Sequence, residues 1–186
     1  MSTHAVLDDG RARFEKALTH LRDQLKKIRT GRASTALVEG LRVDYYGTPT
    51  PIGQMAQISI PEPRQILIKP FDGSMLKELI KAVSQADLGA SPQNDGKVLR
   101  ITLPPLSGEQ RQKYAAKVKE MCEEARISLR NSRRDLNKHV DGLSKDGGLT
   151  EDEHKKLQTQ VQDLLKEYEK KVDDTQKAKV TEIEQV

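Results

Sequence analysis

Three separate stretches of this chain repeat apolar residues at alternating spacings of four and three, and this constrains the fold more than any other feature. The first stretch covers 8–29 and carries Phe14, Leu18, Leu21, Leu25 and Ile28. The second carries Val118, Cys122, Ala125, Leu129, Ser132, Leu136, Val140 and Leu143, and the third carries Leu157, Val161, Leu164, Tyr168, Val172 and Thr175. A helix with such a stripe packs lengthwise against other helices. Because no single helix can bury its own stripe, the sequence predicts a long three-helix bundle.

The helix boundaries have sequence signals of their own. Gly31 is placed to supply a left-handed residue at the end of the first helix. Ser107 with Gln110, and Thr150 with Glu153, each form a capping-box pattern at the start of a later helix.

A segment of different character lies between the first and second stripes. "LRVDYY", "QISI", "QILIKP" and "KVLRITLP" predict short strands, and "GTPTP" predicts a turn. "SMLKELIKAVSQADLG" predicts one amphipathic helix closed by Gly89. We therefore expect an α+β protein. Residues 1–30 and 106–186 would form the three-helix bundle domain, and 31–105 an inserted small β/α/β domain.

The excess charge of the chain is concentrated in "ARISLRNSRRDLNK", residues 125–138. Residues 126–138 hold five cations and one acid, and the resulting charge of +4 equals the formal net charge of the whole chain. On a helix, Arg126, Arg130 and Arg133 fall beside the apolar seam, with Asn137 on the same line and Arg134 a little further round. We call these five residues the arginine ridge.

Two interpretations of the arginine ridge are open. It is either a solvated flank whose cations pair with Glu123 and Asp135, or a surface for RNA or phosphate. We favour the second, because acids are outnumbered and the planar guanidinium fork suits phosphate. The chain has no Trp, two Phe and four Tyr, and Phe14 and Tyr168 sit on seams, so we expect no set of exposed rings for stacking bases. Binding would then use the RNA backbone and shape.

Sites for chemistry are not apparent in the sequence. There is no phosphate-binding glycine loop or dinucleotide fingerprint, and His4, His20, His139 and His154 have no metal-ligand spacing. Cys122 lies on a seam, where a small core side chain is favoured over a nucleophile. We predict a protein that is not an enzyme and uses no cofactor or metal. The single cysteine, the lack of a signal-peptide pattern and the lack of a long apolar run favour a cytoplasmic protein that uses no membrane. We also expect a monomer.

Five stretches, in order, resemble the signature segments of the bacterial ribosome recycling factor family. They are "KIRTGRAS" (27–34), "VDYYGTPTPI" (43–52), "ADLGASPQNDG" (86–96), "ITLPPLSGEQR" (101–111) and the arginine-rich stretch already quoted. The similarity runs nearly end to end. Two departures are Ser132, where the family more often has an apolar residue, and Ser91, which replaces a frequent asparagine.

The resemblance implies an L-shaped molecule, similar to transfer RNA, with two domains on a flexible hinge. It implies binding to large-subunit ribosomal RNA of the post-termination ribosome. With elongation factor G, which binds GTP, the family splits the ribosome into subunits and frees it from the messenger. The RNA-contacting arginines carry over to Arg130, Arg133 and Arg134, with Arg126 and Asn137 on the same ridge. The hinge carries over to Arg29, Thr30, Gly31 and Arg32 against Leu103, Pro104, Pro105 and Leu106.

Other interpretations remain open. In the hinge, Gly31 could merely end a helix and the two prolines could merely delay the next. The whole chain could instead be a helical adaptor for an acidic protein, or a nuclease or phosphotransferase that uses the ridge. The last would require clustered carboxylates or a metal site near the arginines.

Overall fold

A computed structural model describes residues 3–185, which divide into two compact units. The bundle unit comprises Met1–Leu25 and Ala115–Val180. The sheet unit comprises Lys26–Tyr114 and Thr181–Val186. No helix in the described part of the chain is both long and apolar enough to cross a membrane.

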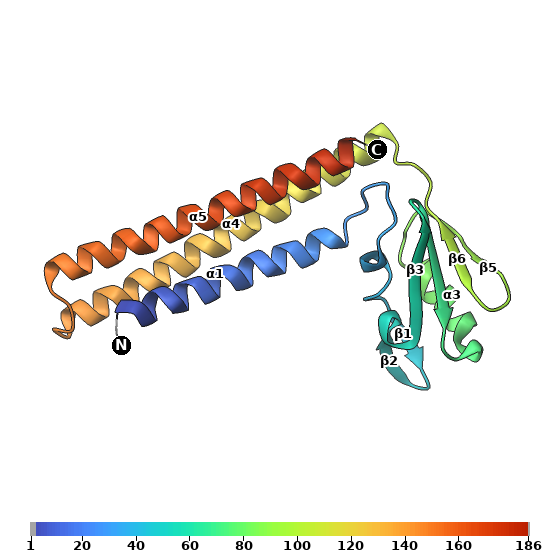
Figure 1. Cartoon of the computed structure of the whole chain (residues 1–186), viewed down its shortest axis with the longest axis horizontal. Coiled ribbons are helices and arrows are strands. Elements are labelled where there is room, and N and C mark those ends of the chain that lie inside the picture. Colours follow the sequence, from blue (N-terminus) through green and yellow to red (C-terminus); the bar gives the residue numbers. More distant parts are fainter. Residues whose placement is uncertain (1–2, 186) are drawn as a thin grey trace. The chain divides into compact units, whose positions relative to one another are not determined.

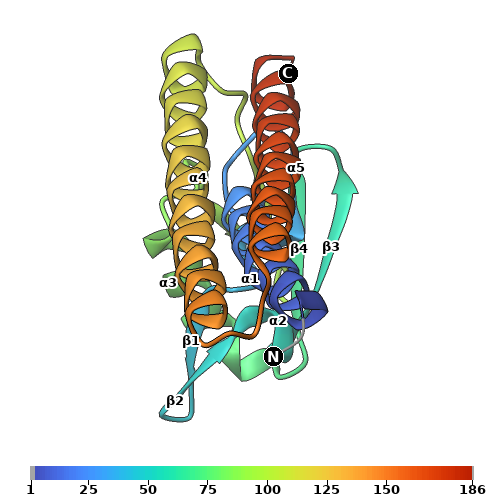
Figure 2. The same cartoon turned by 90° about the vertical axis from the view of Figure 1, so that its left-hand side faces the viewer.

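The bundle unit consists of three long helices that lie side by side along their length (Figures 1 and 2). They are α1 (Thr3–Lys26), α4 (Gly108–Lys145) and α5 (Glu151–Glu184). The predicted seams form the core, and Phe14, Leu129 and Val161 are completely buried. The Phe14 and Tyr168 rings pack at 5.6 Å between centroids, and the Tyr168 hydroxyl donates to Glu15 Oε2 at 2.9 Å. The predicted bundle is confirmed.

The first helix differs from its prediction at both ends. It begins at Thr3 rather than 8, because Val6 and Gly10 continue the buried stripe toward the N-terminus. Gly10 is buried against its neighbours, and a Cβ there would lie 3.0 Å from Leu136 Cδ1 and 3.4 Å from Leu164 Cδ2. The helix ends at Lys26, so Gly31, although left-handed with φ 87°, is not its terminal residue.

Both predicted capping boxes are present. The Gln110 backbone N–H donates to Ser107 Oγ at 3.2 Å, and the Ser107 N–H donates to Gln110 Oε1 at 3.1 Å. The Thr150 N–H donates to Glu153 Oε2 at 2.8 Å, and the Glu153 N–H donates back to Thr150 Oγ1 at 3.3 Å. These bonds satisfy amide groups that the helix itself leaves without acceptors.

The sheet unit contains two antiparallel sheets and one longer helix (Figure 1). Its small sheet pairs β1 (Arg42–Tyr45) with β2 (Thr48–Pro51). The second sheet has the order β3-β4-β6-β5, with bounds Ala56–Glu62, Gln65–Pro70, Leu99–Thr102 and Pro92–Asn94. The helices are α2 (Ile52–Met55), α3 (Leu76–Gln85), and the short 3-10 helices η1 (Thr35–Leu37) and η2 (Gly73–Met75).

The core of the sheet unit forms between α3 and one face of the larger sheet. Alternate residues Ile66 and Ile68 of β4 are buried, opposite Ile101 and Leu99 of β6 in the register. They cluster with the buried apolar residues of α3, Leu76, Leu79 and Val83. The alternation of apolar residues in the sequence of these strands therefore corresponds to this buried face of the sheet.

The prediction of a turn at "GTPTP" is wrong, because most of that segment is strand β2. The turn is made by Tyr46 and Gly47, whose φ angles of 49° and 84° are both positive. Positive φ at both central residues is the requirement of a two-residue type I′ hairpin. Prolines are compatible with β2 because it lies at the edge of a two-stranded sheet.

Candidate nucleic-acid interface

The arginine ridge lies on α4 beside the buried seam, as the helical spacing predicts, but its members differ in exposure. Arg130 and Arg134 are exposed, whereas Arg126, Arg133 and Asn137 are only partly accessible. The difference arises from the neighbouring helix α5, which runs antiparallel to α4 and covers part of the ridge.

Arg126 is the most enclosed arginine, with 17% of its side chain exposed. Its guanidinium donates to Asp173 Oδ1 at 2.6 Å and Gln176 Oε1 at 2.7 Å on α5, and to Glu123 Oε2 at 3.0 Å on its own helix. Burial by itself would lower the pKa of Arg126, but hydrogen bonds to Asp173 and Glu123 outweigh it and the pKa is raised. Arg126 is therefore a fixed link between α4 and α5.

The next two arginines repeat this contact along the helix pair. Arg130 Nε donates to Glu169 Oε1 at 3.1 Å, and its Nη1 donates to Glu123 Oε1 at 3.3 Å. Arg133 Nη1 donates to Gln162 Oε1 at 2.9 Å, while its Nε is buried without a hydrogen-bond partner. We call this series of contacts the α4–α5 polar ladder.

Arg134 and Asn137 lie outside the polar ladder. In the part of the chain that the structure describes, the exposed Arg134 side chain takes part in no hydrogen bond or ion pair. Asn137 Oδ1 is buried without a partner. Among the arginines of the ridge, Arg134 thus has the fewest contacts with other described residues.

The polar ladder corrects the charge argument that the sequence suggested. Counting acids only on α4 made the arginines look unpaired, but α5 supplies Glu169 and Asp173 to them. Glu123 pairs with Arg126 and Arg130 as the solvated-flank interpretation expected, whereas Asp135 lies 3.8 Å from Lys138. These two acids were missed because they lie 47 and 39 residues from Arg126 and Arg130 in the sequence, on another helix. The antiparallel packing expected of two long consecutive helices was the sequence signal that could have indicated these acids as partners of the arginines.

The two segments expected to form a hinge are in contact within the sheet unit. Arg29 is 5% exposed, and its Nη2 donates to the Pro104 carbonyl oxygen. Thr30 is equally buried, and its hydroxyl donates to Glu182 Oε1 at 3.3 Å. Gly31 has φ 87°. Arg32 is exposed.

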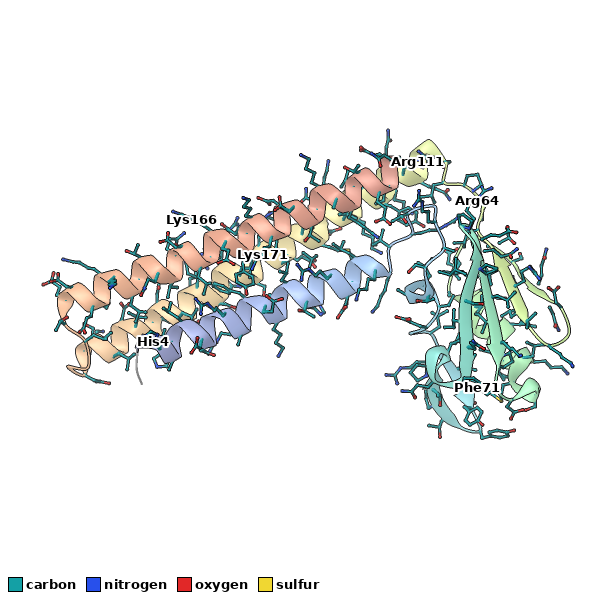
Figure 3. The ribbon with its side chains drawn as sticks, in the orientation of Figure 1. His4, Arg64, Phe71, Arg111, Lys166 and Lys171 are labelled. Carbon is teal, nitrogen blue, oxygen red and sulfur yellow. The ribbon has the colours of Figure 1, made fainter. Side chains whose placement is uncertain are left out.

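The second segment is anchored by the sheet. The Leu103 N–H donates to the Arg64 carbonyl oxygen at 2.8 Å, and Leu103 and Leu106 are buried while Pro104 and Pro105 are exposed. Figure 3 labels Arg64 and also Arg111, which follows this segment at the start of α4 and donates to the Glu184 carbonyl at 3.0 Å. The tie from Arg29 to Pro104 was not predicted, because a basic residue near a helix end usually faces solvent.

Neither a metal centre nor an exposed nucleophile stands out in the described residues. None of them form a group of three or more His, Cys, Asp or Glu side chains that could hold a metal ion. Cys122 is completely buried, and this burial raises the pKa of its thiol. A neutral, enclosed thiol is a poor nucleophile.

Comparison with known proteins establishes the family. The family model described as "Ribosome recycling factor" matches residues 21–183. The chain belongs to the ribosome recycling factor family. Its relatives include the ribosome-recycling factors of Desulfatibacillum aliphaticivorans, 44% identical over 96% of both chains, and of Pseudothermotoga lettingae, 43% identical over 98% of this chain and 99% of the relative.

Solved structures of the ribosome recycling factor family agree with the α+β fold. A solution structure of a ribosome recycling factor matches with a TM-score of 0.78 at 34% identity, covering 100% of this chain and 99% of the other. The factor from T. thermophilus, described with E. coli elongation factor G bound to the E. coli post-termination complex, matches with a TM-score of 0.68 at 35% identity. That alignment covers 98% of this chain and 99% of the other.

Proposed function

We propose that this chain binds the post-termination ribosome and, with elongation factor G and GTP, splits it into subunits and releases it from the messenger. Membership of the family, at 44% identity over 96% of the chain, supports the proposal most directly. The related T. thermophilus factor is described together with elongation factor G on a post-termination complex. GTP would be bound by elongation factor G, and this chain would need no cofactor or chemistry of its own.

The arginine ridge would hold large-subunit ribosomal RNA, with its residues in unequal roles. Arg134 is exposed and has no hydrogen bond or ion pair with another described residue, so its guanidinium is available to a phosphate without breaking any of the contacts seen. Arg130 is 46% exposed and could exchange Glu169 for a phosphate at modest cost, since exposed ion pairs are weak. Arg133 and Asn137 are only partly accessible and would add contacts beside Arg130 and Arg134. Arg126 would mainly position the ridge.

The two short segments 29–32 and 103–106 would act as the hinge between a bundle domain of 1–30 and 106–186 and an inserted domain of 31–105. Gly31 supplies a left-handed backbone conformation. Pro104 and Pro105 each fix one φ angle. Two parallel connections would permit rotation of the domains while keeping them together, and such motion is concentrated in a few residues at the ends of elements.

The test compares two arginines of the same ridge. Arg134→Ala should weaken ribosome binding and lower the slope of log affinity against log salt by roughly 0.7 to 0.9, the value for one lost phosphate contact. Its melting temperature should match that of the wild type. Arg126→Ala is the matched control, because it should lower stability by about 1 kcal/mol through its lost bonds to α5 while changing the salt slope less.

Co-sedimentation with ribosomes at several salt concentrations, together with thermal unfolding, provides both readouts. If Arg134→Ala and Arg130→Ala both keep the wild-type affinity and salt slope, the ridge is a solvated flank and not an RNA contact. Binding that persists after the ribosomal RNA is digested with nuclease would instead favour an adaptor for an acidic protein.

A further inference from the structure

Three aromatic side chains of the sheet unit are exposed, although the sequence predicted no set of exposed rings for stacking bases. The exposed fractions are 37% for Tyr45, 74% for Tyr46 and 75% for Phe71. Tyr45 ends strand β1, Tyr46 follows it in the hairpin turn, and Phe71 directly follows β4 (Figure 3). None of these residues belongs to the arginine ridge or to the hinge segments.

The backbone of Tyr46 is in a conformation that tyrosine rarely adopts. Its φ of 49° is left-handed, and the other central residue of the hairpin is Gly47. Asn and Asp are the usual residues before glycine in a type I′ turn, because a bulky side chain costs roughly 1–2 kcal/mol there. A strained backbone conformation at a residue with an exposed side chain suggests that this side chain has a function.

The Tyr46 ring is also held in place. Its hydroxyl lies 3.1 Å from Asp72 Oδ2, to which it donates, and 3.4 Å from Ser74 Oγ. Asp72 is itself fixed, since its Oδ1 accepts from Ser74 N at 2.9 Å and Ser74 Oγ at 2.7 Å. Tyr45 meets Tyr46 edge to face at 5.0 Å between centroids. The result is a preorganised pair of rings with a large area open to solvent.

Two carboxylates are held beside these rings. Asp44 Oδ1 accepts from the Gly47 N–H at 2.7 Å, which places one carboxylate at the hairpin tip, and Asp72 places a second at the Tyr46 hydroxyl. Hydrogen bonds from the Ser74 side chain and backbone lower the pKa of Asp72, so this carboxylate stays ionised. Two carboxylates repel the phosphates of a nucleic acid, whereas rings beside carboxylates suit a guanidinium, which stacks on a ring and pairs with an acid.

We propose that Tyr45, Tyr46, Phe71 and Asp72 form a docking site for an arginine-bearing, basic segment of a protein partner. The arginine stacks on the exposed face of Tyr46 and pairs with the carboxylates at its edge. Phe71, one residue from Asp72, supplies further apolar area. The sheet unit would therefore carry a protein-binding surface that shares no residue with the arginine ridge and includes the Asp44 and Asp72 carboxylates.

The hairpin allows a substitution that removes the ring without harming the turn. Tyr46→Asn places a residue that tolerates left-handed φ before Gly47, so the free energy of unfolding should stay equal or rise. Phe71→Ser removes the second ring independently. Ile60→Ser is the matched control, because Ile60 is an exposed apolar residue of the same unit, 40% accessible, outside the proposed site.

The experiment titrates the full chain with a short peptide that alternates arginine and serine, and follows the ring resonances of Tyr45, Tyr46 and Phe71 by NMR. We expect these resonances to move, and Tyr46→Asn and Phe71→Ser each to weaken binding two- to five-fold, as loss of an exposed cation–π contact does. Both variants keep every carboxylate, so weaker binding reports the rings and not the charge. Ile60→Ser should bind as the wild type does.

Three outcomes would overturn the proposal. The first is ring resonances that stay fixed with the arginine peptide, or that move equally with a glutamate–serine peptide. The second is wild-type affinity in both ring variants. The third is a single-stranded oligonucleotide that shifts the same resonances more strongly than the arginine peptide, which would make the rings a stacking surface for bases.

Discussion

Arg29 is a buried charged residue of the sheet unit, and its guanidinium contacts parts of the chain that lie far from it in sequence. Its guanidinium joins the two predicted hinge segments through the Pro104 carbonyl, and its Nη1 lies only 2.7 Å from where a Cβ on Gly89 would stand. Gly89 has φ 66°, so both its backbone and its lack of a side chain are needed. The sequence predicted that Gly89 closes the α3 helix, but α3 ends at Gln85.

Gly89→Ala should be more damaging than a comparable glycine substitution elsewhere. Gly96→Ala is the control, because Gly96 also has positive φ, 87°, but nothing lies within 4 Å of its Cβ. Each change incurs the left-handed backbone cost, and Gly89→Ala also displaces Arg29 from Pro104, adding about 1–3 kcal/mol. Urea unfolding measures both variants. Equal losses, or an unchanged difference in an Arg29→Ala background, would show that Arg29 can move away freely.

Cys122 gives a second prediction at this scale. Because the thiol is buried with a raised pKa, it should react with a thiol reagent only after unfolding. Cys122→Ala should cost about 1 kcal/mol through lost packing and leave ribosome splitting intact. A well-folded Cys122→Ala protein without splitting activity would contradict a purely structural thiol.

Hydrogen bonds from capping residues stabilise the ends of the helices, and contacts with nearby side chains order the residues along their length. Figure 3 shows the side chains that line α5, among them Lys166 and Lys171. Lys171 lies 4.1 Å from the Tyr168 ring centroid and 2.7 Å from Glu167 Oε1, so even outward residues of this helix are ordered by contacts one turn away. The start of α5 depends in the same way on Thr150 and Glu153.

The cap of α5 should make bundle stability depend on acid pH. Backbone and hydroxyl hydrogen bonds from Thr150 lower the pKa of Glu153 from 4.5. The stabilisation is therefore fully present above pH 4.5 and is lost as the pH falls through the lower, folded value. Glu153→Gln should flatten this dependence, because glutamine accepts the same bonds without titrating.

Thr150→Ala should cost about 1 kcal/mol near neutral pH, as loss of a cap does. Ser107→Ala at the start of α4 is the comparison, since its box uses Gln110 and should lose similar stability with no added acid dependence. Urea unfolding between pH 3 and pH 7 measures all three variants. A Glu153→Gln protein whose stability follows the wild-type pH curve would exclude Glu153 as the titrating group.

At the scale of the whole molecule, two compact units carry surfaces of opposite character. The bundle unit bears the arginine ridge, and the sheet unit bears the exposed rings and the contacts between the two hinge segments. The proposed recycling activity requires binding and movement to be separable. A substitution in the hinge should then affect splitting without affecting affinity.

Arg29→Ala removes the tie between the hinge segments and leaves every ridge residue intact. We expect ribosome affinity to stay at the wild-type value while subunit splitting with elongation factor G and GTP becomes slower, because the hinge no longer transmits rotation in a defined way. Light scattering follows splitting, co-sedimentation follows binding, and circular dichroism confirms folding. Arg32→Ala, an exposed neighbour, is the control. Normal splitting by Arg29→Ala would show that the tie has no part in the movement.

Features that depend on residues close together in the chain could be predicted from the sequence. The three seams, both capping boxes and the buried alternation of β4 and β6 follow from periods and spacings of a few residues. The folded chain was needed to show that α5 supplies acids to Arg126 and Arg130, that Arg29 bonds to Pro104, and that Asp72 holds the strained Tyr46. Each of these contacts joins residues at least 26 positions apart. Such contacts depend on how whole elements pack against one another, and the spacing of residues within one element does not predict that packing.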